Sequence, residues 1–161
     1  MMTLKLLPVL VVSLSLTLPM ASPRAQPCGP LTVQIADTGP GCAPSGASIP
    51  NLSAFVSAST TLCSVSVALD QKMVVFPIRG ATLLIGVSDP GLAIPFLPGC
   101  ALRAMPDVSV AMVPDVVFGR QHFAFSFPQD PALIGSSLFA QGIWSAAGEL
   151  RFSNGIQLSV R

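Results

Sequence analysis

Charged side chains are scarce in this sequence, and tyrosine is absent. Asp, Glu, Lys and Arg together make up 9% of the 161 residues, and the chain has one histidine and one tryptophan. The basic residues occur singly, so no cluster of Lys and Arg is present to neutralise a phosphate backbone, and nucleic-acid binding is excluded. The shortage of Trp and Tyr also disfavours a carbohydrate-binding surface, which commonly presents such rings to the sugar.

Motifs that carry chemistry are missing as well. The sequence has no G-x-S-x-G elbow, no H-E-x-x-H, no phosphate-binding glycine loop and no Asp-rich calcium loop. A serine hydrolase would have to recruit His122, the only imidazole, and the seven acidic residues are dispersed, most of them in or beside turns. We therefore predict that the protein is not an enzyme and has no catalytic residue, cofactor or metal site.

Apolar residues, proline and glycine are abundant. Apolar residues make up 51% of the chain, which also has 16 prolines and 13 glycines. This composition is too apolar for a disordered chain and is typical of a β-rich exported protein rather than a helical cytosolic one. A chain of this length is expected to form one domain, which can bury roughly two-thirds of its unfolded surface in a single core.

The N-terminal residues predict a secretory signal peptide over residues 1–25. One positive residue, Lys5, precedes an apolar run over residues 6–18, and small and turn-forming residues follow up to Ala25. A membrane anchor is the weaker alternative, because the run is interrupted by a proline and serines and is short against the ~20 residues of a spanning helix. Removal of the signal peptide leaves six basic and seven acidic residues, a net charge of about −1. The mature domain is then residues 26–161, secreted or periplasmic, with no membrane span.

All four cysteines, Cys28, Cys42, Cys63 and Cys100, follow the predicted signal peptide. Export to an oxidising compartment makes two disulfides the expected state. A metal site is disfavoured, because the spacings are wide, no C-x-x-C is present and only one histidine is available. Three pairings are open, but the sequence PGCA surrounds both Cys42 and Cys100, which favours that pair and, by elimination, Cys28 with Cys63.

Alternation of apolar and polar residues predicts strands along the mature chain. Residues 31–37 and 64–70 alternate Leu, Val and Ile with polar or small residues, as half-buried strands do. Residues 81–89 are more uniformly apolar, which predicts a strand covered on both faces. Residues 108–119 contain Pro114, so they predict either two short strands or an edge strand broken at a bulge.

Turn signals recur about every ten residues in the mature chain, a spacing that is typical of a β-sandwich. No long segment keeps a helical stripe, and at most one helical turn is expected at residues 130–135, with Asp130 as cap and Pro131 at the first position. We therefore predict an all-β fold, a single antiparallel β-sandwich that is immunoglobulin-like or jelly-roll-like.

Residues 121–142 combine the histidine with three alternating phenylalanines. Phe123, Phe125 and Phe127 point to one face of a predicted strand, and we interpret them as core residues. His122 points to the other face, and we interpret it as a solvated histidine rather than a general base. Trp144, in the next predicted strand, is expected to fill the core or close one end of it.

The Asn-Gly pair at residues 154–155 is a strong hairpin signal. The apolar residues from Leu150 to Val160 nevertheless stay at even-numbered positions on both sides of the pair, as in one continuous strand. A tight hairpin would also leave a very short first arm. We therefore predict one strand with a local kink or bulge at this pair.

Four segments in this order, TGPGCAPSG, PGCALRA, DPALIGSSLFAQG and LRFSNGIQLSV, carry a resemblance to a known domain. Residues 39–161 are similar to an uncharacterised domain, often at or near the C-terminus, that recurs in exported proteins of aquatic bacteria. The resemblance implies a compact β-sandwich with no established catalytic residues, in which Cys42 and Cys100 correspond to the cysteines of two Gly-Cys motifs. The chain departs from this pattern in its additional Cys28 and Cys63 and in carrying no large upstream domain.

Two classes of function agree with these observations. The first is a non-catalytic structural or interaction module of the cell envelope or secreted space, with an unknown protein or surface partner. The second is an extracellular binding module for carbohydrate or another ligand, because loops at the end of a sandwich suit that work. The presence of one Trp and no Tyr favours the first, and the exposure of Trp144 is the observation that separates them.

Overall fold

The computed structural model describes residues 22–44, 47–70, 80–115, 120–146 and 148–161. Within these ranges the chain is all-β, and each strand runs antiparallel to the neighbours with which it pairs. The helical content of the described residues is one 3₁₀ turn at Pro131–Leu133, which Asp130 caps by accepting a hydrogen bond from the Ala132 N–H. The predicted all-β class and the predicted helical turn are confirmed.

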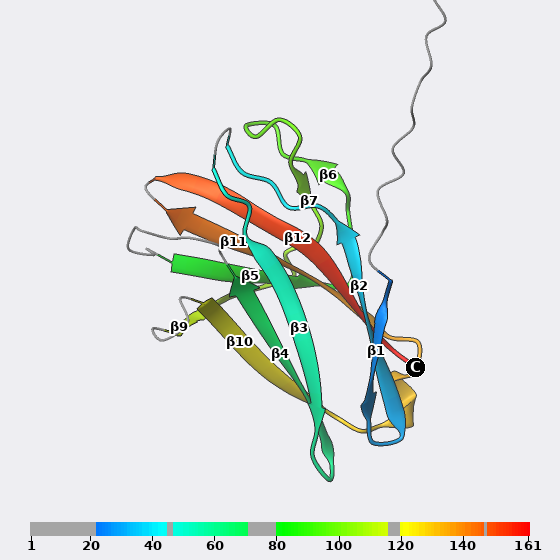
Figure 1. Cartoon of the computed structure of the whole chain (residues 1–161). Coiled ribbons are helices and arrows are strands. Elements are labelled where there is room, and N and C mark those ends of the chain that lie inside the picture. The colour runs from blue at the N-terminus through cyan, green and yellow to red at the C-terminus, as the bar shows by residue number, and fades with distance from the viewer. Residues whose placement is uncertain (1–21, 45–46, 71–79, 116–119, 147) are drawn as a thin grey trace, which may run out of the picture.

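The strands form two main sheets (Figure 1). The six-stranded sheet has, in order, β1 (Arg24–Cys28), β2 (Leu31–Gly39), β12 (Glu149–Val160), β11 (Ser137–Ala146), β5 (Gly80–Gly86) and β8 (Val108–Ala111). The four-stranded sheet has, in order, β3 (Asn51–Ala58), β4 (Leu62–Asp70), β10 (Arg120–Pro128) and β9 (Val113–Asp115). A separate pair joins β6 (Leu92–Ala93) to β7 (Ala101–Leu102).

The start of β1 overlaps the predicted signal peptide. Arg24 and Ala25 pair with β2, whereas residues 1–21 lie outside the described residues. In the described ranges, no helix has the length and apolar character needed to cross a membrane.

Side chains from the two sheets meet in one shared core. Val65, Val67 and Leu69 of β4 are fully buried, and so is Trp144 of β11 in the other sheet. Burial of one such Val or Leu side chain contributes about 1.5–3 kcal/mol, so this core is the main force that holds the two sheets together. Trp144 therefore fills the core, which is one of its two predicted places.

β5 is buried on both faces, as its uniformly apolar sequence predicts. Leu83 belongs to the shared core, and its neighbour Leu84, on the other face, is only 7% exposed. On that outer face, the Gln141 side chain of β11 forms hydrogen bonds with the segment that contains β6 and β7. Its Oε1 accepts from the Arg103 N–H at 2.9 Å, and its Nε2 donates to the Ala101 carbonyl at 3.1 Å.

Residues 108–115 form two short strands in different sheets, the first of the two predicted alternatives, while residues 116–119 lie outside the described part of the chain. β8 is an edge of the six-stranded sheet, and β9 is an edge of the four-stranded sheet. Between them the chain crosses at Met112, whose side chain is buried in the core and whose N–H donates to the Ala81 carbonyl at 2.9 Å. Pro114 has no N–H to donate, which suits its place on an edge strand.

β12 is one continuous strand with a register shift beside Gly155, as predicted for the Asn-Gly pair. The shift has an effect that parity alone does not predict. Phe152 packs on the outer side with Ile94 and Cys100, whereas Ile156 belongs to the shared core. The extra residue of a bulge reverses the alternation of faces, so residues of equal parity on its two sides point in opposite directions.

Two disulfides join Cys28 to Cys63 and Cys42 to Cys100, the same pairing that the sequence favours. The first connects β1 to β4 and therefore links the two sheets. The second connects the segment after β2 to the segment before β7, where Cys100 packs against Phe152. Both are compatible with a secreted or periplasmic protein.

Candidate binding cleft

The alternation of β10 places its side chains as predicted. His122 is exposed on the outer face of the four-stranded sheet, between Ala68 of β4 and Val113 of β9. Phe123, Phe125 and Phe127 point inward and pack against the shared core, but they are only half-buried. In the part of the chain that the structure describes, no group of three or more His, Cys, Asp or Glu side chains could hold a metal ion.

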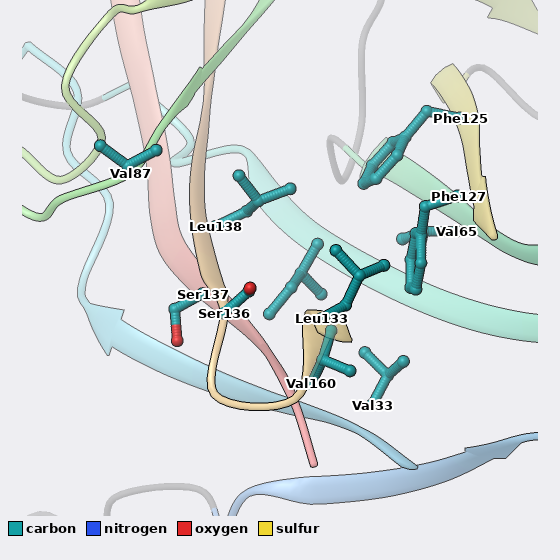
Figure 2. Close-up of a pocket in the computed structure, with 11 residues that line it drawn as sticks. Val33, Val65, Val87, Phe125, Phe127, Leu133, Ser136, Ser137, Leu138 and Val160 are labelled. Atoms are coloured by element: carbon teal, nitrogen blue, oxygen red, sulfur yellow. The ribbon is translucent and has the colours of Figure 1, made fainter. Parts of the chain in front are cut away.

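Two of these half-buried phenylalanines, Phe125 and Phe127, line a cleft between the two sheets. The cleft has a volume of about 500 Å³, within the range of ligand pockets. Phe125 and Phe127 of β10 face Leu138 of β11 across it, and Leu133 of the 3₁₀ turn lies between them (Figure 2). The other lining side chains are Val33, Val65, Val87, Ser136, Ser137, Leu158 and Val160.

The described lining of this cleft is apolar and uncharged. Its polar side chains are the hydroxyls of Ser136 and Ser137. The Ser137 hydroxyl is already engaged, because it lies 3.0 Å from the Ser159 hydroxyl and accepts a hydrogen bond from Gln157 Nε2 at 3.2 Å. No titratable side chain lines the cleft within the described residues, so this lining can hold an apolar group but offers no acid, base or nucleophile for catalysis.

The cleft is open because β9 is short. β10 pairs with β4 from Gln121 to Pro128, but it pairs with β9 only from Arg120 to His122. The chain comes from β8 of the six-stranded sheet through Met112 and enters the four-stranded sheet only at Val113. Residues 123–128 of β10 are therefore left at an edge with no strand beside them in the described part of the chain (Figure 1).

Apolar side chains of the six-stranded sheet are exposed at the same opening. Ile85, which packs against the core, pairs with Val108 of β8 and therefore shares its face, yet Val108 is 52% exposed. Val87, just beyond β5, lines the cleft and is 70% exposed. The six-stranded sheet thus extends past the four-stranded sheet and leaves part of its inner face uncovered.

The opposite side of the molecule, where β1 and β3 lie close together, is closed by side chains. The Val56 N–H on β3 donates to Oε1 of Gln26 on β1. Further along β3, the Leu52 N–H donates to Oδ1 of Asn154 at 2.7 Å, and Asn154 Nδ2 donates to the Leu52 carbonyl at 3.1 Å. These side chains occupy backbone groups at the edge of β3 and so prevent further strand pairing there.

A smaller cavity of about 220 Å³ lies on this closed side. Its lining is mixed and includes Arg24, Asp37 and Asn51. Asp37 accepts a hydrogen bond from Asn154 Nδ2 at 2.9 Å, so it supports the contact that closes β3. We assign this cavity a structural role.

Trp144 does not form a ligand platform, because it is fully buried. The exposed aromatic side chains of the described residues are Phe55 on the outer face of β3 and Phe96 between β6 and β7, and neither lines either cavity. The cleft itself has no sequence motif. The inward direction of Phe125 and Phe127 was its one visible signal, and it did not distinguish a cleft wall from a closed core.

Comparison of the chain with protein-family models, with curated proteins and with solved structures finds no match.

Proposed function

We propose that this chain is an exported, non-catalytic interaction module, built as a single β-sandwich, that binds an apolar segment of its partner in the cleft beside β10. The signal peptide over residues 1–25 and the secreted or periplasmic location are part of this proposal, and so is the similarity to an uncharacterised domain of exported bacterial proteins. The single observation that carries the proposal is the apolar cleft of about 500 Å³ at an uncovered sheet edge.

The position of the cleft supports binding rather than a packing defect. Phe125 and Phe127 are only half-buried, and Val87 at the mouth is 70% exposed. Contiguous apolar surface beside a cavity commonly marks a site where another molecule is bound. The disulfide between Cys28 and Cys63 holds the two sheets together, so that the cleft is formed before the partner arrives.

The test uses a neutral apolar dye, N-phenylnaphthylamine, whose fluorescence rises on transfer from water to an apolar site. The disulfide-bonded chain should bind it saturably. Leu133→Glu, which places a carboxylate at the cleft, should lower the affinity at least about tenfold, because an unpaired charge cannot lie against an apolar ligand without a large desolvation cost.

The matched control is Ile134→Glu. Ile134 is the next residue of the same connection, is 56% exposed and does not line the cleft, so its substitution should leave dye affinity unchanged. Absence of saturable dye binding, or equal loss in both variants, would remove the proposal.

A binding module for a small apolar ligand is the second candidate, and the same cleft volume favours it. A carbohydrate ligand has less support, since Trp144 is buried and the described cleft lining has few polar groups.

A further inference from the structure

We propose that the partner segment is an extended peptide that pairs with β10 along residues 123–128 as an additional strand of the four-stranded sheet. This inference rests on the proposed function, because it assigns the occupant of the same cleft. The occupant would have apolar side chains at alternate positions and no charge on the face that enters the cleft.

The edge strands of the two main sheets are short, contain proline or are covered by side chains. β1 contains Pro27 and spans five residues, β8 spans four, and β9 contains Pro114 and spans three. The fourth edge, β3, is closed by Gln26 and Asn154. Short strands, prolines and covering side chains are the means by which proteins prevent edge-to-edge pairing.

Beyond the end of β9, β10 has one of these protections, Pro128 at its last residue. Its residues 123–127 read FAFSF, without proline, lysine or any other charged residue. In an antiparallel strand every second residue directs its N–H and C=O to one side. β4 lies on only one side of β10 here. Every second residue therefore directs its backbone N–H and C=O to the other side, where another strand could pair with them over about 20 Å, the length of six extended residues.

This uncovered edge of β10 borders the apolar cleft, because Phe125 and Phe127 belong to both. A strand placed beside residues 123–128 continues the line of β9 and lies over the uncovered inner face of the six-stranded sheet. Its inward side chains would meet Phe125, Phe127 and Leu138, while its outward side chains would lie beside Ala124 and Ser126 on the exposed face. Backbone hydrogen bonds would then supply affinity, and the apolar cleft would select alternate side chains, as in other cases of strand addition.

The described cleft lining and the adjacent edge of β10, from Phe123 to Pro128, are both uncharged. A charged side chain carried into the cleft would have no partner there. The inward positions of the bound segment are therefore aliphatic or aromatic.

The test uses a short synthetic peptide of alternating valine and threonine with blocked ends. It should displace N-phenylnaphthylamine from the chain, and it should slow amide hydrogen exchange at alternate residues of 123–127. Two further peptides have the same side chains but carry backbone N-methyl groups either on the valines or on the threonines. Only one of these sets of N–H groups can face β10, so one methylated peptide should bind at least about tenfold more weakly and the other should bind like the parent.

The outcomes separate this inference from the proposed function. If dye binds in the cleft but both methylated peptides bind like the parent peptide, or no peptide binds, strand addition is wrong and the cleft stands as a site for apolar ligands. If the chain without peptide forms a dimer in which residues 123–127 are protected from exchange, the edge is occupied by a second copy and the inference is overturned. Loss of peptide binding in Leu133→Glu, with retention in Ile134→Glu, supports it.

Discussion

The two sides of this molecule differ at their sheet edges: the edge of β3 is bonded by side chains, and part of the edge of β10 is uncovered in the described residues. Where β1 meets β3, Gln26 and Asn154 bond to backbone groups of β3, and the disulfide between Cys28 and Cys63 links the sheets. Where β10 passes beyond β9, the described residues leave the edge bare and an apolar cleft open beneath it. Both sides consist of β-strands. They differ because side chains bond to the edge of β3, whereas no described strand or side chain does so at residues 123–128 of β10.

This difference indicates where stability and binding reside. Side-chain bonds to a strand edge use polar groups that would otherwise lie unpaired, and they add to stability. An uncovered edge with half-buried aromatic side chains adds less to stability but remains available to another chain. We therefore expect substitutions on the closed side to change mainly the free energy of unfolding, and substitutions at the cleft to change mainly binding.

Loss of the disulfide between Cys28 and Cys63, which links β1 to β4, should have the largest effect on the free energy of unfolding. Replacement of Cys28 and Cys63 together by alanine should lower the free energy of unfolding by about 4 kcal/mol, because the cross-link over 35 residues no longer restricts the unfolded chain. Urea denaturation of oxidised protein measures this change. The comparison is Cys42 and Cys100 replaced together, where the separation of 58 residues predicts a similar loss of about 4 kcal/mol. A loss below about 1 kcal/mol for the first pair would contradict its role.

Asn154→Ala should have the next largest effect. It removes the acceptor of the Leu52 N–H and the donor to the Leu52 carbonyl and to Asp37, at a cost of about 1–3 kcal/mol for buried groups left unpaired. Exchange of the Leu52 amide should become faster. The control is Asn51→Ala. Asn51 is exposed and precedes Leu52 in β3, so this substitution should change stability by less than about 0.5 kcal/mol. Equal effects at the two positions would show that Asn154 does not close the edge.

Phe125→Ala tests the open side. Full burial would predict a loss of about 3–5 kcal/mol, but Phe125 is half-buried at the cleft, so we expect about 1–2 kcal/mol. The comparison is Leu69→Ala, at a fully buried position of β4, which should cost about 2–5 kcal/mol. A larger loss for Phe125→Ala than for Leu69→Ala would mean that the cleft is a closed part of the core.

His122→Ala should have the smallest effect. Its side chain is exposed on the outer face, away from the cleft, so stability should change by less than about 0.5 kcal/mol. Dye and peptide affinities should also match those of the unsubstituted chain. A clear loss of binding would place a functional site on the outer face and would reverse the comparison of the two sides.

Local pattern was sufficient to predict much of this fold. The alternation at residues 31–37 and 64–70, the uniform apolarity of β5, the inward phenylalanines of β10 and the cap at Asp130 each depend on a few neighbouring residues, and each was predicted correctly. β1 and β3 were not predicted, because β1 contains Pro27 and β3 is held partly by Gln26 and Asn154, which come from other strands.

The sequence by itself determined the strand type, the facing of side chains within each regular strand and the presence of four cysteines able to pair. Only the tertiary structure decided that Phe152 and Ile156 face opposite sides, that the chain changes sheets at Met112, and that residues 123–128 form an uncovered edge above a cleft. The reason is physical: periodicity reports which side chains share a face, but an edge is open or closed according to where distant strands end, and those ends are set by packing between the sheets.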